Sequence, residues 1–466
     1  MTQVYDRQCD GRTKFQKELH TPLVGKDGEH DMSTISSLCL QKPEVRCFWY
    51  SNVPRLMEQK SQAPVNTGRK SSKVDSSSNP SKLTQTTWSF DESFHYVVAG
   101  YARRIIPQVC VAEKYRGEYR ICWPHNPGTS NILDIIMKTG KASISSASLP
   151  AINCYLQFFN ANGTEASVNM DVCNFDSLEE WTDCLHAAVA NFEVPLPYNT
   201  KNDTKCGFPL WRYEGSDNLR VEVREELSIT RILRMQHLND AGVWEPCSVD
   251  LGVLEKCDEL LPATEMYCSY TYNTDQELKM KRADPEPYRY FYKDFVTFST
   301  KNVSGGDPQS ITIITKSPVE ALYWVSENTS MEDFNVRSNY STDPECVYSG
   351  GDPISLSTLK YGNDALFEQW TSDHFSQSQP RCHSFSIPHE PGYHMFAFGN
   401  DPHLADPDVG LVFPSTDAGN LSVEYNKVEG NEYILHVIAR ITRCITFEPT
   451  NPGEDDTSYK KTIEVA

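Results

Sequence analysis

The apolar residues of this 466-residue chain recur mainly with a period of two, which predicts β-strands with one buried face. The longest such run is 433–447, where Tyr433, Leu435 and Val437 open an apolar series with His436 and Arg440 among the alternate positions. Prolines, glycines, asparagines and aspartates separate the runs, as turns require. The strands predicted in this way are 94–99, 108–112, 119–123, 132–137, 154–159, 219–224, 266–272, 288–299, 311–315, 319–325, 393–398, 409–413, 421–425 and 433–447. A polar segment, 142–148, is predicted to be a strand or a loop.

One stretch, 176–192, has a helical period instead. Asp176 and Glu179 have the spacing of a capping box, which marks a helix N-terminus. Apolar residues then follow at spacings of three and four: Leu178, Trp181, Leu185, Ala188, Val189 and Phe192. We expect a helix here, packed on the end of a barrel.

The first 82 residues differ from the rest of the chain. Residues 61–82 are rich in serine and lysine and have almost nothing to bury, which predicts a linker or a disordered segment. A turn-rich stretch at 241–262 is the candidate junction between two strand-rich parts. The predicted organisation is therefore an N-terminal arm and linker (1–82), a first strand-rich domain (83–245) and a second one (246–466) that ends in a flexible acidic tail.

The net charge of −20 argues against a protein that coats nucleic acid, because phosphate binding requires a basic face. Hydrophobic residues make up 39% of the chain, enough for a globular core. The sequence contains neither an apolar run of membrane-spanning length nor the apolar region of a signal peptide at its N-terminus. Synthesis in the cytosol is the expectation from these features.

The 15 cysteines are odd in number and irregularly spaced, and no Cys-x-x-Cys pair occurs. This pattern argues against a zinc ribbon and favours mostly buried free thiols over a disulfide framework. Asn-x-Ser/Thr sequons, which are candidates for glycosylation in surface loops, occur at Asn162, Asn202, Asn302, Asn328, Asn339 and Asn420.

The sequence has no Walker loop, no Gly-x-Ser-x-Gly and no His-Glu-x-x-His, so no catalytic residue is predicted. Its richest group of metal-binding residue types is Cys382, His383, His389, His394 and His403. A cupin-like site needs His-x-His with a carboxylate, and a facial-triad site needs His-x-Asp/Glu; neither pairing occurs. These histidines are interpreted as core or loop residues, with no metal and no cofactor. Turn chemistry beside prolines accounts for the remaining candidate ligands, Asp401, Asp406 and Asp408.

Several motifs occur in a characteristic order. Pro391-Gly392 opens the run Pro-Gly-Tyr-His-Met-Phe-Ala-Phe, which Asp401-Pro402, then Gly-Leu-Val-Phe413-Pro-Ser and Asn-Leu-Ser-Val follow. Upstream, Lys-Ser-Pro318-Val-Glu-Ala-Leu-Tyr-Trp324-Val joins two strands through a proline turn. In the first half, a strand ending at Trp123 leads into Pro-His125-Asn126-Pro-Gly and an Ile-rich strand, so the two halves echo one another.

This order resembles the major capsid proteins of nucleocytoplasmic large DNA viruses. The chain departs from the family pattern at Val-Phe413-Pro-Ser, where the family usually has Asn-Phe-Ser, and at Pro-His125-Asn126-Pro-Gly, where it has Asn-Leu-Gly-His-Asn. The resemblance covers residues 85–450. It implies an all-β fold of two consecutive eight-stranded antiparallel jelly rolls with a few short helices and an N-terminal arm.

The same resemblance implies a structural role without catalysis. Members of the family form homotrimers, and each trimer is a pseudo-hexagonal capsomer. The capsomers tile an icosahedral shell, in which neighbouring capsomers and minor capsid proteins are the partners. Contact with nucleic acid is not expected, and contact with an inner membrane is indirect. The expected location is the virion, after assembly in the host cytoplasm. Two alternatives are a minor capsid or penton-associated paralogue and a cellular jelly-roll protein of the cupin or lectin type.

Overall fold

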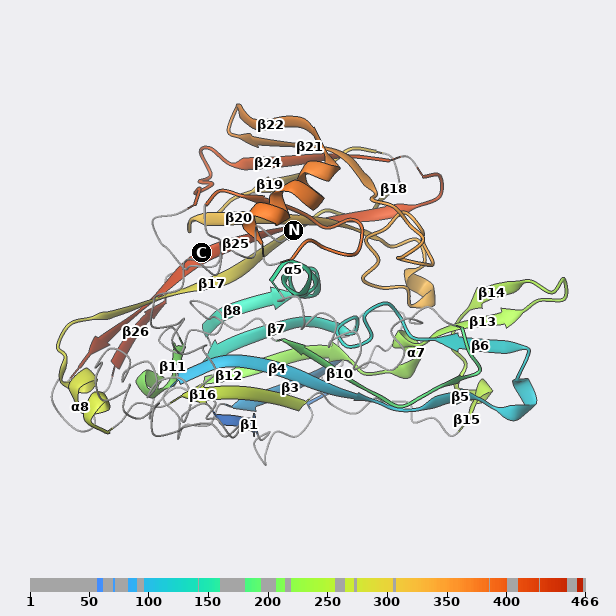
Figure 1. The fold of residues 1–466 in the computed structure, drawn as a ribbon, viewed down its shortest axis with the longest axis horizontal. Coiled ribbons are helices and arrows are strands. Elements are labelled where there is room, and N and C mark those ends of the chain that lie inside the picture. The colour runs from blue at the N-terminus through green and yellow to red at the C-terminus, as the bar shows by residue number, and fades with distance from the viewer. Residues whose placement is uncertain are drawn as a thin grey trace, which may run out of the picture. The chain divides into compact units, whose positions relative to one another are not determined.

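The computed structural model divides the chain into two compact units, Met1–Leu56 and Met57–Ala466. It describes residues 57–61, 70–71, 83–89, 96–140, 142–159, 181–193, 207–213, 219–255, 265–271, 275–304, 307–384, 386–399, 410–426, 428–450 and 459–463, all in the second unit. Every strand pair among the named strands is antiparallel (Figure 1).

Two five-stranded sheets form most of the N-terminal half. One has the order β1-β16-β4-β10 with β11 beside β4: β1 Met57–Ser61, β16 Glu265–Thr271, β4 Tyr96–Ile106, β10 Ala188–Glu193 and β11 Phe208–Pro209. The other has the order β2-β3-β12-β7-β8: β2 Lys70–Ser71, β3 Leu83–Ser89, β12 Leu219–Glu226, β7 Ile132–Thr139 and β8 Ala142–Ser148. Helix α5, Leu149–Phe159, follows β8 directly.

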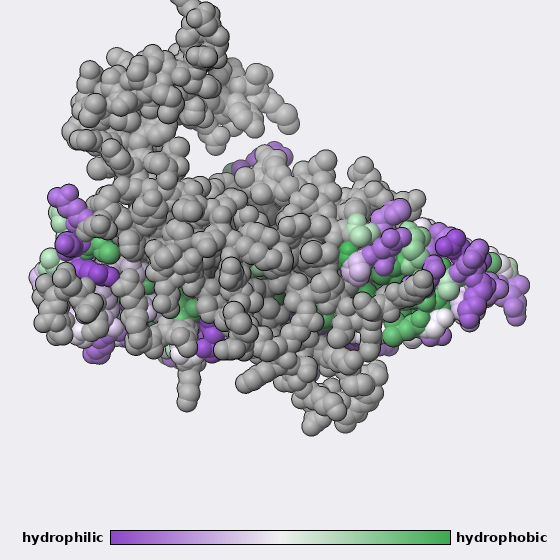
Figure 2. All heavy atoms as spheres, turned by 90° about the horizontal axis from the view of Figure 1, so that it is seen from below, coloured by the Kyte–Doolittle hydropathy of each residue, from purple (hydrophilic) through white to green (hydrophobic). Residues whose placement is uncertain are grey.

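Two smaller sheets extend this half. Their strands are β14 Trp244–Cys247, β13 Arg234–Leu238 and β6 Tyr119–Cys122 in one, and β15 Leu254–Glu255, β5 Val109–Val111 and β9 Cys184–Leu185 in the other. Short helical turns accompany them: η1 Glu113–Tyr115, η3 Leu210–Tyr213, α7 Ile229–Ile232 and η4 Leu251–Val253. Ile121, Leu233 and Val253 belong to their shared apolar core. In Figure 2, apolar residues show at the end that carries these sheets.

The C-terminal half contains two further sheets. The larger has the order β17-β25-β20-β23, with β18 and β26 also on β25: β17 Tyr288–Ser299, β25 Glu432–Pro449, β20 Val319–Asn328, β23 His394–Ala397, β18 Val303–Ser304 and β26 Tyr459–Ile463. The smaller has the order β19-β24-β21-β22: β19 Gln309–Ile313, β24 Gly419–Tyr425, β21 Ile354–Tyr361 and β22 Asp364–Thr371. The helical segments are α8 Asp275–Ala283, η5 Glu332–Phe334, η6 His374–Ser378 and α9 Gln379–His383. None of the helices in the described part of the chain is long and apolar enough to cross a membrane.

Strand β20 is buried on both faces because it lies between two cores. Leu322 and Trp324 point into the core enclosed by the two C-terminal sheets. Tyr323 and Val325, of opposite parity, belong to a core shared with α5 and the N-terminal half. Outer strands such as β19 and β24 instead alternate buried with more exposed residues, as the period of two predicts.

The structure corrects two secondary-structure predictions. Residues 154–159, predicted as a strand, belong to helix α5, where Ile152, Cys154 and Phe158 are buried. A short run that is apolar on every side does not distinguish strand from helix by its period. Conversely, the described part of the predicted 176–192 helix forms β9 and β10. Strand β10 pairs with β4 over its whole length, and such tertiary pairing overrides local helix signals.

Four assignments of segments also differ. Residues 265–271, predicted to open the second strand set, pair with β4 of the first half. Within the predicted arm and linker, 57–61 pairs with β16 and 70–71 with β3. The predicted strand 409–413 contributes only a single bridge, between Leu411 and Val319, in its described part. Residues 459–463 of the predicted flexible tail form β26.

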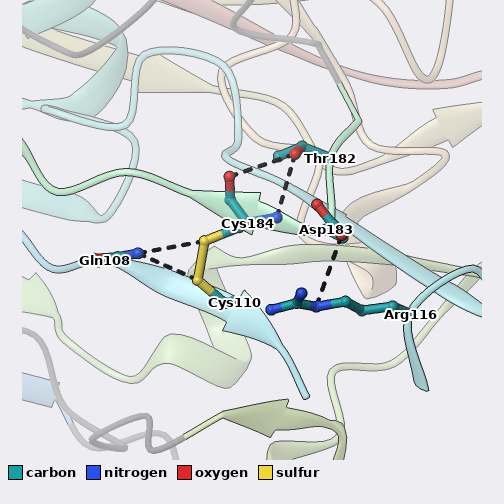
Figure 3. The surroundings of a disulfide bond; sticks show 6 residues. All are labelled: Gln108, Cys110, Arg116, Thr182, Asp183 and Cys184. Atoms are coloured by element: carbon teal, nitrogen blue, oxygen red, sulfur yellow. Dashed lines mark hydrogen bonds and ion pairs between the residues drawn. A yellow bond between two sulfur atoms is a disulfide. The ribbon is translucent and has the colours of Figure 1, made fainter. Parts of the chain in front are cut away.

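A disulfide joins Cys110 on β5 to Cys184 on β9, which are directly opposite in the strand register (Figure 3). Gln108 Nε2 lies 3.4 Å from each sulfur, and Arg116 pairs with Asp183 beside it at 3.8 Å. The free cysteines include Cys122, Cys154, Cys247, Cys346, Cys382 and Cys444. Burial raises the pKa of the Cys154 thiol far above its usual range, so this thiol stays protonated.

Candidate functional site at the junction of the two halves

Helix α5 places apolar side chains between the two halves. The Phe158 ring lies 5.2 Å from that of Tyr323 on β20 and 6.4 Å from that of Tyr393, edge to face in the latter case. Tyr323 and Tyr393 are fully or almost fully buried, and both belong to the shared core with Ile152. Burying these apolar side chains contributes several kcal/mol to the association of the two halves, at about 25 cal/mol per Å² of apolar surface removed from water.

Buried polar side chains of α5 fix its position relative to the C-terminal half. Asn153 Nδ2 donates to Ser338 Oγ at 3.1 Å and to Tyr340 Oη at 3.0 Å. At the end of the helix, the Ser386 hydroxyl donates to the Gln157 carbonyl. An unpaired buried amide would cost about 1–3 kcal/mol, so these bonds select one arrangement of the two halves.

Strands β8 and β17 are joined by a second polar group. Ser146 N–H donates to Asp294 Oδ1 at 3.1 Å, and Tyr292 Oη donates to the Ile144 carbonyl at 2.8 Å. Arg443 on β25 pairs with Asp294 at 3.1 Å and also donates to the Ile144 carbonyl. Burial raises the pKa of Asp294 to about 6, although Arg443 and the backbone N–H groups act to lower it.

Further links come from the loops after β20. Asn335 Nδ2 donates to the carbonyls of Thr230 and Leu233 beside α7, at 2.9 and 2.7 Å. Arg337 Nη2 lies 2.9 Å from Glu226 Oε2 at the end of β12. The two halves are therefore held by paired polar groups along their contact as well as by a shared apolar core.

The sequence motifs of the two halves meet at a buried contact between a histidine and a glutamate. His125 Nε2, in the turn after β6, lies 3.0 Å from Glu390 Oε2, and both side chains are at least 95% buried. Glu390 directly precedes Pro391-Gly392. Gly392 has φ +85°, and a Cβ there would lie 1.9 Å from the Tyr340 carbonyl oxygen, so only glycine fits this close approach.

The other predicted motif residues are structural as well. Trp123 is buried in the core of the two small sheets. Asn126 has φ +51°, and its carbonyl accepts the N–H groups of Thr129 and Ser130 in a tight turn. The Pro318 carbonyl accepts the Thr442 N–H. The carbonyl of buried Phe413 accepts the Thr315 N–H, and the Phe413 N–H donates to Thr315 Oγ1.

Trp324 stacks on His394 with ring centroids 5.6 Å apart, and both are fully buried. His394 Nε2 lies 2.8 Å from Asp352 Oδ2, and Nδ1 lies 3.3 Å from the Trp324 carbonyl. Burial raises the pKa of Asp352, but His394 and the hydrogen bonds from Ser372 and the Ile354 N–H bring it below its ordinary value.

The described members of the cysteine–histidine group do not form a shared site, and no metal had been assigned to the group from sequence. His394 is committed to Asp352, Cys382 is exposed on α9, and His403 lies outside the described residues, as do Asp401, Asp406 and Asp408. Among the described residues, no three histidine, cysteine or acidic side chains are arranged to hold a metal ion.

The sequons fall in different environments. Asn328 and Asn339 are buried, and their Nδ2 atoms donate to the carbonyls of Ser341 and Asp343. A glycan attached to either nitrogen would displace these bonds, so the expectation of surface loops is wrong at both. Asn302 is exposed and Asn420 half-buried, whereas Asn162 and Asn202 lie outside the described residues.

Sequence reasoning missed the partners that make the junction, above all Glu390, Asn153 and Asn335. Each is a common polar residue whose partner is remote in the chain, so spacing carries no signal for it. The proximity of Glu390 to Pro391-Gly392 was the one local indication.

Comparisons with known proteins agree with this geometry. A family model described as "Large eukaryotic DNA virus major capsid protein" matches residues 293–436, from β17 into β25. Residues 293–436 are therefore similar to this family. The major capsid protein of Lymphocystis disease virus 1 (isolate Darai) is 25% identical over 247 residues, which is 49% of this chain and 50% of that protein. The match thus spans about half the length of this relative.

Solved structures show the same fold. The capsid protein in the quasi-atomic model of the PBCV-1 virus capsid is similar with a TM-score of 0.59 and 12% identity, covering 82% of this chain and 92% of that one. The Faustovirus major capsid protein gives a TM-score of 0.60 at 9% identity, covering 84% and 90%. The chain therefore has the double jelly-roll fold of these capsid proteins.

Proposed function

We propose that this chain is the major capsid protein of an icosahedral large DNA virus and that it functions as a building block of the shell. The observation that carries the proposal is the family match over β17–β25 in a chain whose two jelly rolls share one core. A shell subunit has to keep a fixed shape under load, and a shared core with paired polar groups provides that rigidity.

The capsomer in this proposal is a homotrimer. Two similar jelly rolls per chain would give three chains six comparable wedges around one axis, which closes a ring. Neighbouring capsomers and minor capsid proteins are the proposed partners, in virions assembled in the host cytoplasm. The proposed domain division keeps a first jelly roll up to about residue 245 and a second one after it, with β16 returning to the first.

A minor capsid or penton-associated paralogue would have the same fold. Quantitative mass spectrometry of purified virions separates the two roles. The major protein is expected to be the most abundant shell component, and a copy number confined to the vertices would assign the minor role instead.

A further inference from the structure

The edge strand β22 exposes two large apolar side chains. Leu366 is 43% exposed and Trp370 44%, whereas Phe367 between them is buried. The Trp370 ring is held by His374, at 4.6 Å and nearly perpendicular, and by Phe367 at 5.9 Å. A tryptophan that is both well supported and half exposed is typical of an interface anchor rather than of a free surface.

Acidic side chains surround this apolar pair. Asp364, Glu368 and Asp373 are exposed beside it, against one exposed lysine, Lys360, on the neighbouring strand. Within the described part of the chain, Glu368 makes no ion pair. Two copies of this surface facing each other would place acid against acid, which is destabilising. A symmetric contact of β22 with itself is therefore disfavoured, and the partner surface should be basic.

The opposite edge of the same sheet exposes an apolar side chain beside a basic one. On and after β19, Ser310, Thr312, Ile314 and Lys316 share one outward parity and are all exposed. Ile314 is 50% exposed, and the only charge in this row is the Lys316 ammonium. Lys316 also makes no ion pair with a described residue.

The backbone of β22 is too irregular for simple strand addition. Gln369 has φ +53°, and the pairing of β21 with β22 shifts register twice between Ser357 and Lys360. Such irregularities at a sheet edge interrupt continued pairing. A partner on β22 would thus be recognised through side chains rather than through a ladder of backbone hydrogen bonds.

We propose that β22 of one copy docks beside the end of β19 of a second copy. Trp370 and Leu366 pack against Ile314, and Glu368 pairs with Lys316. Strands β22 and β19 are the two edges of the smaller C-terminal sheet (Figure 1). The charge complementarity of the two edges is what selects a second copy of this chain. This inference rests on the proposed shell function and adds the surface used. A head-to-tail contact of this kind generates either a closed ring or a continuing array.

A charge exchange on the full-length protein tests the proposal. Glu368→Lys and Lys316→Glu should each weaken self-association, measured by sedimentation velocity over a concentration series, and the double variant should restore it. Trp370→Ala should weaken association about tenfold or more. Glu332→Lys and Val243→Ala, exposed changes of the same kind elsewhere, serve as controls. Circular dichroism checks that each variant is folded.

The outcomes separate this inference from the proposed function. If the wild type self-associates and the three single variants do so equally well, the docking surface is wrong while the shell function stands. Loss in both charge variants without recovery in the double variant also overturns the Glu368–Lys316 pairing. A wild type that neither associates nor builds shells contradicts the proposed function itself.

Discussion

Asp294 is a buried carboxyl at the junction whose pKa is raised to about 6 by burial. Between pH ~4 and ~6 the folded protein keeps a proton on this group that the unfolded chain has released. The stability contributed by Asp294 is therefore fully present below the unfolded pKa and is lost as pH rises to 6, by up to about 3 kcal/mol.

Asp294→Asn removes the titration without changing the side-chain size. From pH 4 to pH 7, we expect the free energy of unfolding of the wild type to fall relative to that of this variant by a large part of that amount. Urea denaturation at several pH values measures it, with exposed Asp307→Asn as control. A difference that does not change with pH would contradict the assignment.

Trp324 is fully buried between His394 and Phe375, so Trp324→Ala should lower the free energy of unfolding by about 3–5 kcal/mol. Trp370→Ala is the matched control on the exposed strand β22 and should cost much less in the isolated protein. His394 is also a core residue, and His394→Ala would leave the Asp352 carboxylate without its partner. Equal effects of the two tryptophan changes in chemical denaturation would argue against the packing described.

At the scale of elements, β26 fastens the end of the chain to the N-terminal half. The Tyr459 ring lies 5.6 Å from that of Trp211, and the Arg212 guanidinium lies over both rings. Lys461 lies 4.6 Å from the centre of the Tyr213 ring. Strand β26 thus connects β25 to η3, which belongs to the other half.

Ending the chain after residue 450 should therefore lower the unfolding temperature and expose the region around Trp211 to protease. Cation–π contacts and aromatic burial of this kind contribute about 0.5–2 kcal/mol each. Lys460→Ala, which removes only an exposed ion pair with Glu448, is the control and should have almost no effect. Unchanged stability of the shortened chain would show that β26 does not fasten the halves.

The N-terminal segment offers a second test of elements. Deleting residues 1–56 keeps the whole of the unit Met57–Ala466 and should leave its unfolding temperature unchanged. Deleting residues 1–82 also removes β1 and β2 and should lower it, because β16 and β3 each lose one of their two partner strands. Differential scanning calorimetry of both deletions measures this. Equal unfolding temperatures would show that residues 57–71 do not stabilise the sheets and belong to the arm, as predicted from sequence.

Strands with one buried face were predictable from sequence because their alternation is local; β19 and β24 show it plainly. The elements that were wrong, α5 and β10, have apolar residues whose partners are distant in the chain. Their type was decided by tertiary pairing and packing that spacing alone does not encode. The same holds for the junction: His125 was singled out, but its partner Glu390 was not.

At the scale of the whole molecule, the two jelly rolls share one core, and we propose that they form one rigid subunit of a symmetric capsomer. Three such subunits would place six similar units around an axis and close the assembly. Six similar units around one axis would let one kind of chain build a shell in which each capsomer has six neighbours.

Electron microscopy of the purified full-length protein, with its mass measured by light scattering, tests whether the chain forms this capsomer. The expected result is a uniform particle of three 52.9 kDa chains with three-fold symmetry and a hexagonal outline. A monomer that persists at high concentration, or a particle without three-fold symmetry, would contradict it.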